Sequence, residues 1–275
     1  MSSTPSMNNG PSNGGLPTGV RVLLPVGVIL GALVLWEVLV RVNQIPHYIL
    51  PAPTLVAQTL AENFGSLAGS WWFTIKITFG ALLLAASGGV LLAVMFALSR
   101  WVAASLWPFA IVLQVTPIVA IAPLILIYVE STTAALLLCA WIVAFFPVLS
   151  NTVIGLRAAE PGLRELFTLY RATPVQRLRF LLVPSSLPYF LAGLKVAGGL
   201  SLIGAIVAEF VAGVAGKETG LASRILEASY RTETPKMFAA LVLVSLTGVA
   251  IFFLFEGLSR WLLGSWHATE RERGE

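Results

Sequence analysis

Few residues in this 275-residue chain carry groups that could do chemistry, and none of their spacings predicts catalysis. Aspartate is absent, the only histidines are His47 and His267, and Cys139 is the single cysteine. A Ser–His–Asp triad is therefore impossible, and no His–Cys–carboxylate cluster has the spacing of a metal site. Gly216–Glu218 is only a fragment of a phosphate-binding Gly-x-x-x-x-Gly-Lys-Ser/Thr loop. We expect no catalytic, cofactor-binding or metal-binding residues in this chain.

Two charged residues lie inside one long apolar run. Lys195 and Glu209 are separated by about 21 Å along a helix, so they cannot pair within it. Charges inside a membrane are costly and usually face a cavity or a partner. Lys195 either extends to the membrane surface or faces such a cavity. Glu209 either contacts another protein or caps the polar loop at 213–236.

The longest polar stretch between apolar runs is loop 156–186, which carries five arginines. Apolar residues recur at near-helical spacing in its first half, around Glu165. Thr173 followed by Pro174 is typical of a helix start, and Pro184 predicts where that helix ends. The pattern predicts two short amphipathic helices. They either lie on an anionic membrane surface or dock into a groove of a soluble protein.

The composition indicates which elements must position these residues. The chain is 57% hydrophobic and 11% charged, with a mean hydropathy of +0.88, whereas about 25% of a soluble domain is charged. A soluble enzyme, a disordered chain and a disulfide scaffold are excluded. We predict an all-α membrane protein with about six transmembrane helices. Apolar runs of sufficient length lie at roughly 20–42, 71–99, 105–129 (interrupted by prolines), 133–155, 187–212 and 237–264.

The two ends of the chain are polar. Residues 1–18 contain Ser, Asn, Gly, Pro and Thr without charge, which predicts a disordered leader without the features of a cleaved signal peptide. Residues 265–275 predict a solvated tail. With six spans both termini share a side, and that side collects ten Lys and Arg residues against six on the other. This bias favours cytoplasmic termini and a cytoplasmic loop 156–186, although the basic residues at 213–236 weaken it.

Glu165 and Pro184 follow a spacing that resembles the cytoplasmic loop of binding-protein-dependent ABC importer permeases. The family pattern is Glu-Ala-Ala, three residues, Gly, nine residues, Ile, one residue and Leu-Pro. Glu165 stands at the glutamate and Pro184 at the last proline without a gap, but bulkier residues replace both alanines and Arg171 replaces the glycine. Arginine adopts the left-handed turn of a glycine only at a cost. Either the turn is built differently, from Ala172–Pro174, or the partner is specialised.

Four other segments extend this resemblance. Leu50–Thr54, followed by a short amphipathic segment, resembles the Leu-Pro-Ser-Pro element of taurine, alkanesulfonate and nitrate permeases. Pro117–Leu126 resembles their third membrane helix, Phe146–Arg157 the stretch before the loop, and Pro188–Phe210 the fifth helix. The resemblance covers about 45–264, so the chain is identified as a member of the ABC importer permease family, and it resembles the taurine, alkanesulfonate and nitrate subfamily.

The resemblance implies a type I importer permease architecture in a bacterial inner membrane, with a permease domain at 19–264. Two permeases, here a homodimer, form the core in membrane lipid, and a binding protein delivers the solute from outside. ATP and Mg belong to a separate dimer of ATP-binding cassette subunits, which a coupling helix at about Gly162–Thr173 contacts. The residues assigned to this coupling are Arg164, Glu165, Leu166, Phe167, Leu169, Tyr170, Arg171, Ala172 and Thr173.

A translocation path is expected along the third and fifth spans. Broken helices in transporters often line the substrate route, and small residues from Gly193 to Ala208 permit close helix packing as well as a path wall. The candidate path residues are Gln114, Thr116, Pro117, Lys195, Ser201 and Glu209.

The function expected from these features is transport of a small solute without intrinsic catalysis. An autonomous secondary transporter or channel is the alternative, although no inverted repeat is evident between 20–129 and 133–264. A membrane-embedded enzyme ranks third, because the catalytic residue types are missing. The resemblance favours a sulfonate, taurine or nitrate-like anion as substrate, with riboflavin or a thiamine-pyrimidine precursor also open.

Overall fold

The computed structural model describes residues 18–213 and 219–264, and every regular element in these two ranges is a helix. The expected leader (1–18), apart from its last residue, and the tail (265–275) lie outside the described residues. The helices are α1 (Thr18–Val42), α2 (Pro53–Leu98), α3 (Arg100–Val115), α4 (Ile118–Tyr128), α5 (Thr132–Arg157), α6 (Pro161–Leu169), α7 (Pro174–Arg177), the π-helix η1 (Leu178–Leu182), α8 (Val183–Ala212), α9 (Leu221–Tyr230) and α10 (Thr234–Leu263).

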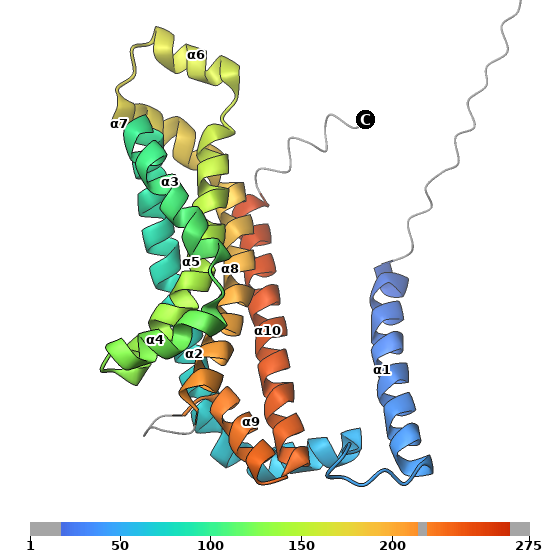
Figure 1. Ribbon diagram of the computed structural model, residues 1–275. Coiled ribbons are helices and arrows are strands. Elements are labelled where there is room, and N and C mark those ends of the chain that lie inside the picture. The colour runs from blue at the N-terminus through green and yellow to red at the C-terminus, as the bar shows by residue number, and fades with distance from the viewer. Residues whose placement is uncertain (1–17, 214–218, 265–275) are drawn as a thin grey trace, which may run out of the picture.

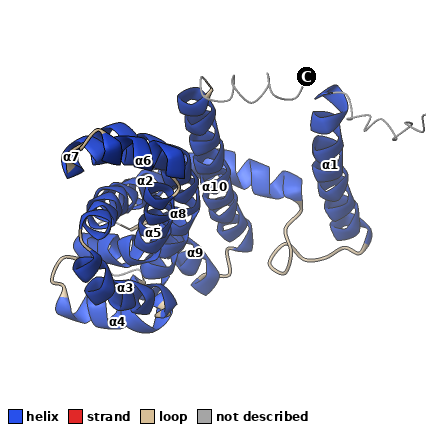
Figure 2. Ribbon diagram, turned by 90° about the horizontal axis from the view of Figure 1, so that it is seen from above, coloured by secondary structure: helices blue, strands red, loops and turns tan. Residues whose placement is uncertain are grey.

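The predicted all-α membrane architecture is confirmed. Five helices are long and apolar enough to cross a membrane, and the bent pair of α3 and α4 makes a sixth candidate. α2, α5, α8 and α10 run side by side along a bundle (Figures 1 and 2). α6 lies at one end of this bundle and α9 at the other, which we call the α6 end and the α9 end (Figure 1). The first turn of α1 points toward the α6 end and its last turn lies at the α9 end, whereas α10 ends near the α6 end (Figure 1).

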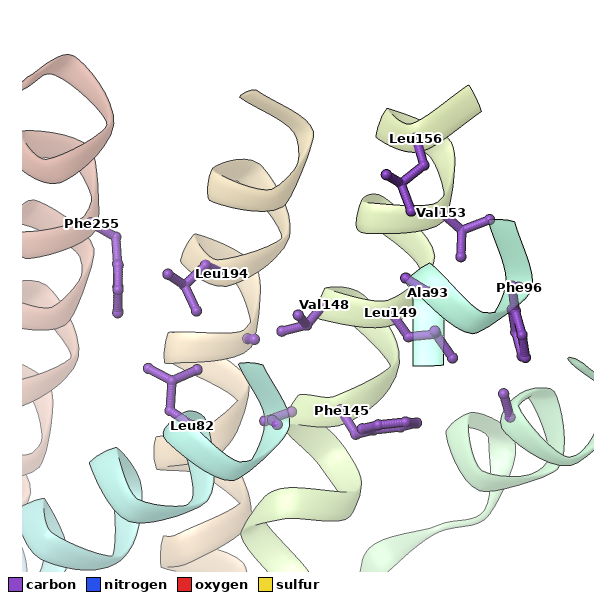
Figure 3. Close-up of a cluster of buried hydrophobic side chains, with 14 of the residues drawn as sticks. Leu82, Ala93, Phe96, Phe145, Val148, Leu149, Val153, Leu156, Leu194 and Phe255 are labelled. Atoms are coloured by element: carbon purple, nitrogen blue, oxygen red, sulfur yellow. The ribbon is translucent and has the colours of Figure 1, made fainter. Parts of the chain in front are cut away.

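The core of the bundle forms where α5 lies between α2 and α8. Apolar side chains from α2, α5, α8 and α10 meet there, among them Phe96, Phe145, Leu149 and Phe255 (Figure 3). Small residues allow this close approach. A Cβ atom on Gly193 of α8 would lie 2.8 Å from the Pro147 carbonyl oxygen of α5. The small residues of α8 therefore serve helix packing.

The third predicted span is not a single helix. α3 and α4 meet at an angle of 101°, and Thr116 and Pro117 interrupt the helix between them. A proline forces the residue before it out of the helical region, and Thr116 is extended at φ −72° and ψ 121°. Pro123 lies inside α4 without ending it. Of the two prolines, Pro117 therefore makes the break.

Two predicted boundaries within long helices are wrong. The amphipathic segment after Leu50–Thr54 and the span at 71–99 form one helix, because no proline follows Pro53 before α2 ends at Leu98. Pro184 does not end the helix that begins at Pro174, and residues 174–212 run on as one span. The π-helix η1 ends at Leu182, two residues before Pro184, and its wider turn accommodates a residue that lacks an N–H group.

α1 stands apart from the other helices (Figures 1 and 2). Its apolar side chains are largely exposed from Leu23 to Val42. It contacts the bundle near its last turns, where the Trp36 ring lies 5.8 Å from that of Phe238. Glu37 accepts hydrogen bonds from the Thr54 N–H and hydroxyl, which ties α1 to the start of α2.

Candidate functional site

The two short helices predicted in loop 156–186 are present as α6 and α7. Thr173 caps α7, since its side chain accepts from the Gln176 N–H while the Gln176 side chain accepts from the Thr173 N–H. Pro174 occupies the first turn of this helix. The predicted helix start at Thr173 and Pro174 is thus confirmed.

α6 projects from the bundle with no residue buried (Figure 1). The side chains of Leu169 and Tyr170 are 80% and 77% exposed. A hollow of about 350 Å³ separates α6 from the following turns and is lined by Leu166, Phe167, Tyr170, Ala172, Gln176 and Phe180. The segment thus presents an exposed apolar surface.

Arg171 makes the turn that a glycine makes in the family pattern. Its φ is +53°, in the left-handed region. The Arg171 N–H donates to the Thr168 carbonyl and the Ala172 N–H to the Phe167 carbonyl, at 3.0 and 2.9 Å. These two bonds form a Schellman motif, which usually places glycine in the left-handed position. The left-handed position of the turn is therefore Arg171 itself. The alternative that Ala172–Pro174 build the turn in another way was wrong.

Two arginines fasten α6 to the bundle. The Arg164 guanidinium donates to the carbonyl oxygens of Leu156 and Arg157, which are free at the end of α5. The Arg177 guanidinium donates to the Thr168 hydroxyl at 3.3 Å. Arg164 therefore points back to α5, although we grouped it with the coupling residues.

Glu165 lies beside a shallow hollow of about 380 Å³ that Arg164, Thr168 and Leu169 also line. No lysine, arginine or histidine within 18–213 or 219–264 forms an ion pair with it. Its carboxylate is therefore available on the same exposed segment as Leu169 and Tyr170.

Lys195 has a partner that sequence reasoning missed. Its Nζ atom lies 2.6 Å from Oε2 of Glu256 on α10, and 4.1 Å from the centre of the Phe252 ring. Glu256 also accepts from Arg260. Nothing in the sequence pairs two residues 61 positions apart on different helices.

Glu209 is buried and caps the start of α9. One carboxylate oxygen accepts from the Thr74 hydroxyl at 2.8 Å and the other from the Ala222 N–H at 3.0 Å. Thr74 in turn accepts from the Leu221 N–H at 2.9 Å. We expected Glu209 either to contact another protein or to cap the polar loop at 213–236, and the structure shows that it caps this loop at the start of α9. Thr74 went unnoticed because a threonine in a membrane span commonly serves helix packing.

The other path candidates divide into two groups. Ser201 is completely buried, and its hydroxyl donates to the Gly198 carbonyl in the same helix. Gln114 and Pro117 are exposed, and Thr116 is partly exposed. These three residues lie together at the break between α3 and α4.

No group of three potential metal-ligating side chains occurs in the part of the chain that the structure describes. His47 is exposed, and its ring lies 5.9 Å from that of Tyr48. His267 lies outside the described residues.

Comparison with known proteins relates this arrangement to transport. The model of the binding-protein-dependent transport system inner membrane component family matches residues 88–264. The riboflavin transport system permease protein RibX of Chloroflexus aurantiacus is 34% identical over 90% of both chains. A probable ABC transporter permease protein of Haemophilus influenzae is 29% identical over 89% of this chain and 96% of its own.

The fold also has a solved counterpart. The crystal structure of an amino acid ABC transporter with histidines matches with a TM-score of 0.60 and 17% identity, over 74% of this chain and 97% of the other. Further relatives are named as permeases for formylaminopyrimidine, aliphatic sulfonates, bicarbonate and nitrate. The chain belongs to the binding-protein-dependent transport system inner membrane component family, the permeases of ABC importers.

Proposed function

We propose that this permease works as a homodimer in a bacterial inner membrane and is driven by separate ATP-binding subunits that contact α6. Both termini and the α6 end then face the cytoplasm. ATP and Mg bind to the partner, and this chain takes no part in hydrolysis. The observation that carries the proposal is the exposed apolar surface of α6 and its turn, with Leu169 and Tyr170 at its centre.

The way α6 is attached supports a role in coupling. Arg164 joins α6 to the end of α5, and Arg177 joins it to α7, which continues through η1 into α8. A force on α6 therefore reaches the two long helices α5 and α8. A conformational signal needs an element that both sites touch and that moves as a unit. Glu165, on the exposed side of this element, would contact the ATP-binding subunit.

The solute path is proposed to pass the break between α3 and α4. Gln114 and Thr116 offer polar groups there, and irregular backbone inside a membrane is tolerated where it lines a cavity. Lys195, Ser201 and Glu209 make their polar contacts within the chain. They therefore support the shape of the path more than they line it.

A small anion, such as a sulfonate, taurine or nitrate, is the favoured substrate. A pocket of about 230 Å³ at the α9 end is lined by Lys76, Arg224, Ser66, Ser70 and Thr219, together with Gly69 and Phe73. Two cations and three hydroxyls in that volume suit an oxyanion. Riboflavin or a pyrimidine remains the second candidate, because RibX is 34% identical to this chain.

The proposal is tested with the permease, its ATP-binding subunit and its binding protein together. We expect Glu165→Arg to abolish co-purification of the ATP-binding subunit and the ATPase activity that the loaded binding protein stimulates. Glu62→Arg is the matched control, because Glu62 is an exposed helical glutamate whose only side-chain bond in the described residues is with Gln58. Unchanged assembly and coupling in Glu165→Arg would refute the role of α6.

The substrate is identified by thermal shift of the binding protein. Sulfonates, taurine, nitrate, riboflavin and pyrimidines are added in turn, and a ligand at a hundredfold excess over Kd stabilises by about 2.7 kcal/mol. The stabilising ligand should then raise the ATPase activity of the complex. Transport into liposomes that contain this chain alone would instead favour the secondary transporter or channel.

A further inference from the structure

A cavity of about 710 Å³ involves α6 through Arg164 alone. It is bounded by the ends of α2 and α5, the first half of α3, α6, the end of α7 and η1, and it is open on one side. Four arginines line it, namely Arg100, Arg157, Arg164 and Arg177, and none of the lining residues is acidic.

These arginines lack acidic partners. None of the four forms an ion pair with a carboxylate in residues 18–213 or 219–264. The Nε atoms of Arg164 and Arg177 are buried and have no hydrogen-bond acceptor among the residues that the structure describes. Buried polar groups in proteins are nearly always hydrogen-bonded, and a charged donor without an acceptor is costly. An anion in the cavity would supply the missing acceptors.

The remaining wall of the cavity is apolar. Phe96 of α2, Trp107 of α3 and Leu182 of η1 line it beside the arginines. The rings of Phe96 and Trp107 pack 5.8 Å apart in this wall. A small hydrated anion would leave such a surface uncovered, whereas an amphipathic anion would cover it.

The cavity lies at the depth where a membrane meets water. Three membrane-spanning helices end or begin beside it, at Leu98, Arg100 and Arg157. Trp101 is 74% exposed next to Arg100, and exposed tryptophans are typical of this depth. Lipid headgroups occupy the same level, and basic pockets between membrane helices bind them.

We propose that this cavity binds an anionic phospholipid, with its phosphate among the four arginines and its glycerol and upper acyl carbons against Phe96 and Trp107. The guanidinium groups donate to the phosphate oxygens. The lipid thereby links Arg100 of α3 to Arg164 and Arg177 of the α6 region. This site does not depend on the substrate or on the ATP-binding partner.

The test uses the delipidated full-length chain in detergent and native mass spectrometry. Phosphatidylglycerol, phosphatidylcholine and inorganic phosphate are titrated separately. We expect one phosphatidylglycerol per chain to bind at least about tenfold more tightly than phosphatidylcholine, and inorganic phosphate to bind weakly. The double variant Arg100→Gln/Arg157→Gln should weaken phosphatidylglycerol binding at least about tenfold, since each arginine near an anionic headgroup contributes about fivefold.

The variant and its control are chosen so that folding is preserved. Neither the Arg100 nor the Arg157 side chain makes a hydrogen bond or ion pair in the described residues, and Arg100 lies over the Trp101 ring. Arg179→Gln is the control, because Arg179 lies over the ring of its own neighbour Phe180, outside the cavity. It should bind phosphatidylglycerol like the wild type.

Three results would overturn the proposal. Equal affinity for phosphatidylcholine would remove the role of the headgroup charge. An equal loss of phosphatidylglycerol affinity in Arg179→Gln and in the double variant would show that the lipid responds to the overall positive charge of the surface and not to this cavity. Tight phosphate binding that phosphatidylglycerol does not displace would identify a soluble anion as the occupant. The lipid comparison on the wild type decides the matter even if the double variant does not fold.

Discussion

The two ends of the bundle carry short helices that are attached in opposite ways. At the α9 end, Leu221 and Ala222 are buried, and their N–H groups bond to Thr74 and Glu209. Arg224 adds a bond to Ser70 and another to Glu227, and the second lowers the pKa of that carboxyl below its ordinary value. At the α6 end no residue of α6 is buried, and two arginines provide the side-chain links.

The difference separates what holds the fold from what meets a partner. Residues of α9 are part of the apolar core that Leu67, Leu221 and Leu243 form, so changes there should alter the stability of the whole chain. No residue of α6 is buried as a whole, so changes at its exposed positions should leave stability nearly unchanged and act on binding. Single substitutions at either end test this expected difference in stability.

The largest effect is expected from Glu209→Ala. The substitution leaves the Ala222 N–H buried without an acceptor and removes the bond from the Thr74 hydroxyl to the carboxylate, and it should lower the free energy of unfolding by about 3 kcal/mol. Denaturant titration of the chain in detergent measures this loss. Glu62→Ala, at an exposed position, should change stability by no more than about 0.5 kcal/mol. If Glu209→Ala lowered the free energy of unfolding as little as Glu62→Ala, Glu209 would not anchor α9.

Gly220→Ala should have the next largest effect. An added Cβ would overlap the Glu209 carboxylate and push it out of the cap. We expect a loss of about 2 kcal/mol, typical of overpacking. Gly162→Ala in α6 is the matched control, since nothing lies within 4 Å of its Cβ position, and it should not destabilise the chain. A neutral Gly220→Ala would contradict the tight packing of α9.

Arg171→Gly should have the smallest effect, and in the opposite direction. Glycine occupies the left-handed region without the side-chain penalty, so the turn after α6 should gain about 0.5–1 kcal/mol. Hydrogen exchange of the Ala172 amide, whose bond to Phe167 closes the turn, reports this gain. In Arg171→Asn the exchange rate of the Ala172 amide should lie between those of the wild type and Arg171→Gly. Faster exchange in Arg171→Gly would show that arginine contributes a contact of its own.

Features that depend on local composition could be predicted from the sequence. Hydropathy located the spans because it sums over about 20 neighbouring residues, and Thr173–Pro174 marked a helix start because capping is local. The resemblance to the permease family rested on the same kind of contiguous spacing, from Glu165 to Pro184.

Features that depend on distant contacts could not be predicted. Lys195 and Glu256 meet across two helices, and Glu209 meets Thr74 from 135 positions away. The continuation of the helix through Pro184 required the π-helix before it, for which the sequence has no clear signal. The alternative of a turn built from Ala172–Pro174 was wrong because the cost of arginine in the left-handed region, about 1–2 kcal/mol, is small enough for the rest of the turn to offset.

The most direct test of the contrast between the two ends is hydrogen exchange of the permease, alone and in complex with its ATP-binding subunit. We predict that the amides of α6 exchange rapidly in the free chain and are protected in the complex, whereas those of α9 are protected in both states. Protection of α6 that is already as strong as that of α9 in the free chain, or unchanged exchange of α6 in the complex, would contradict the account.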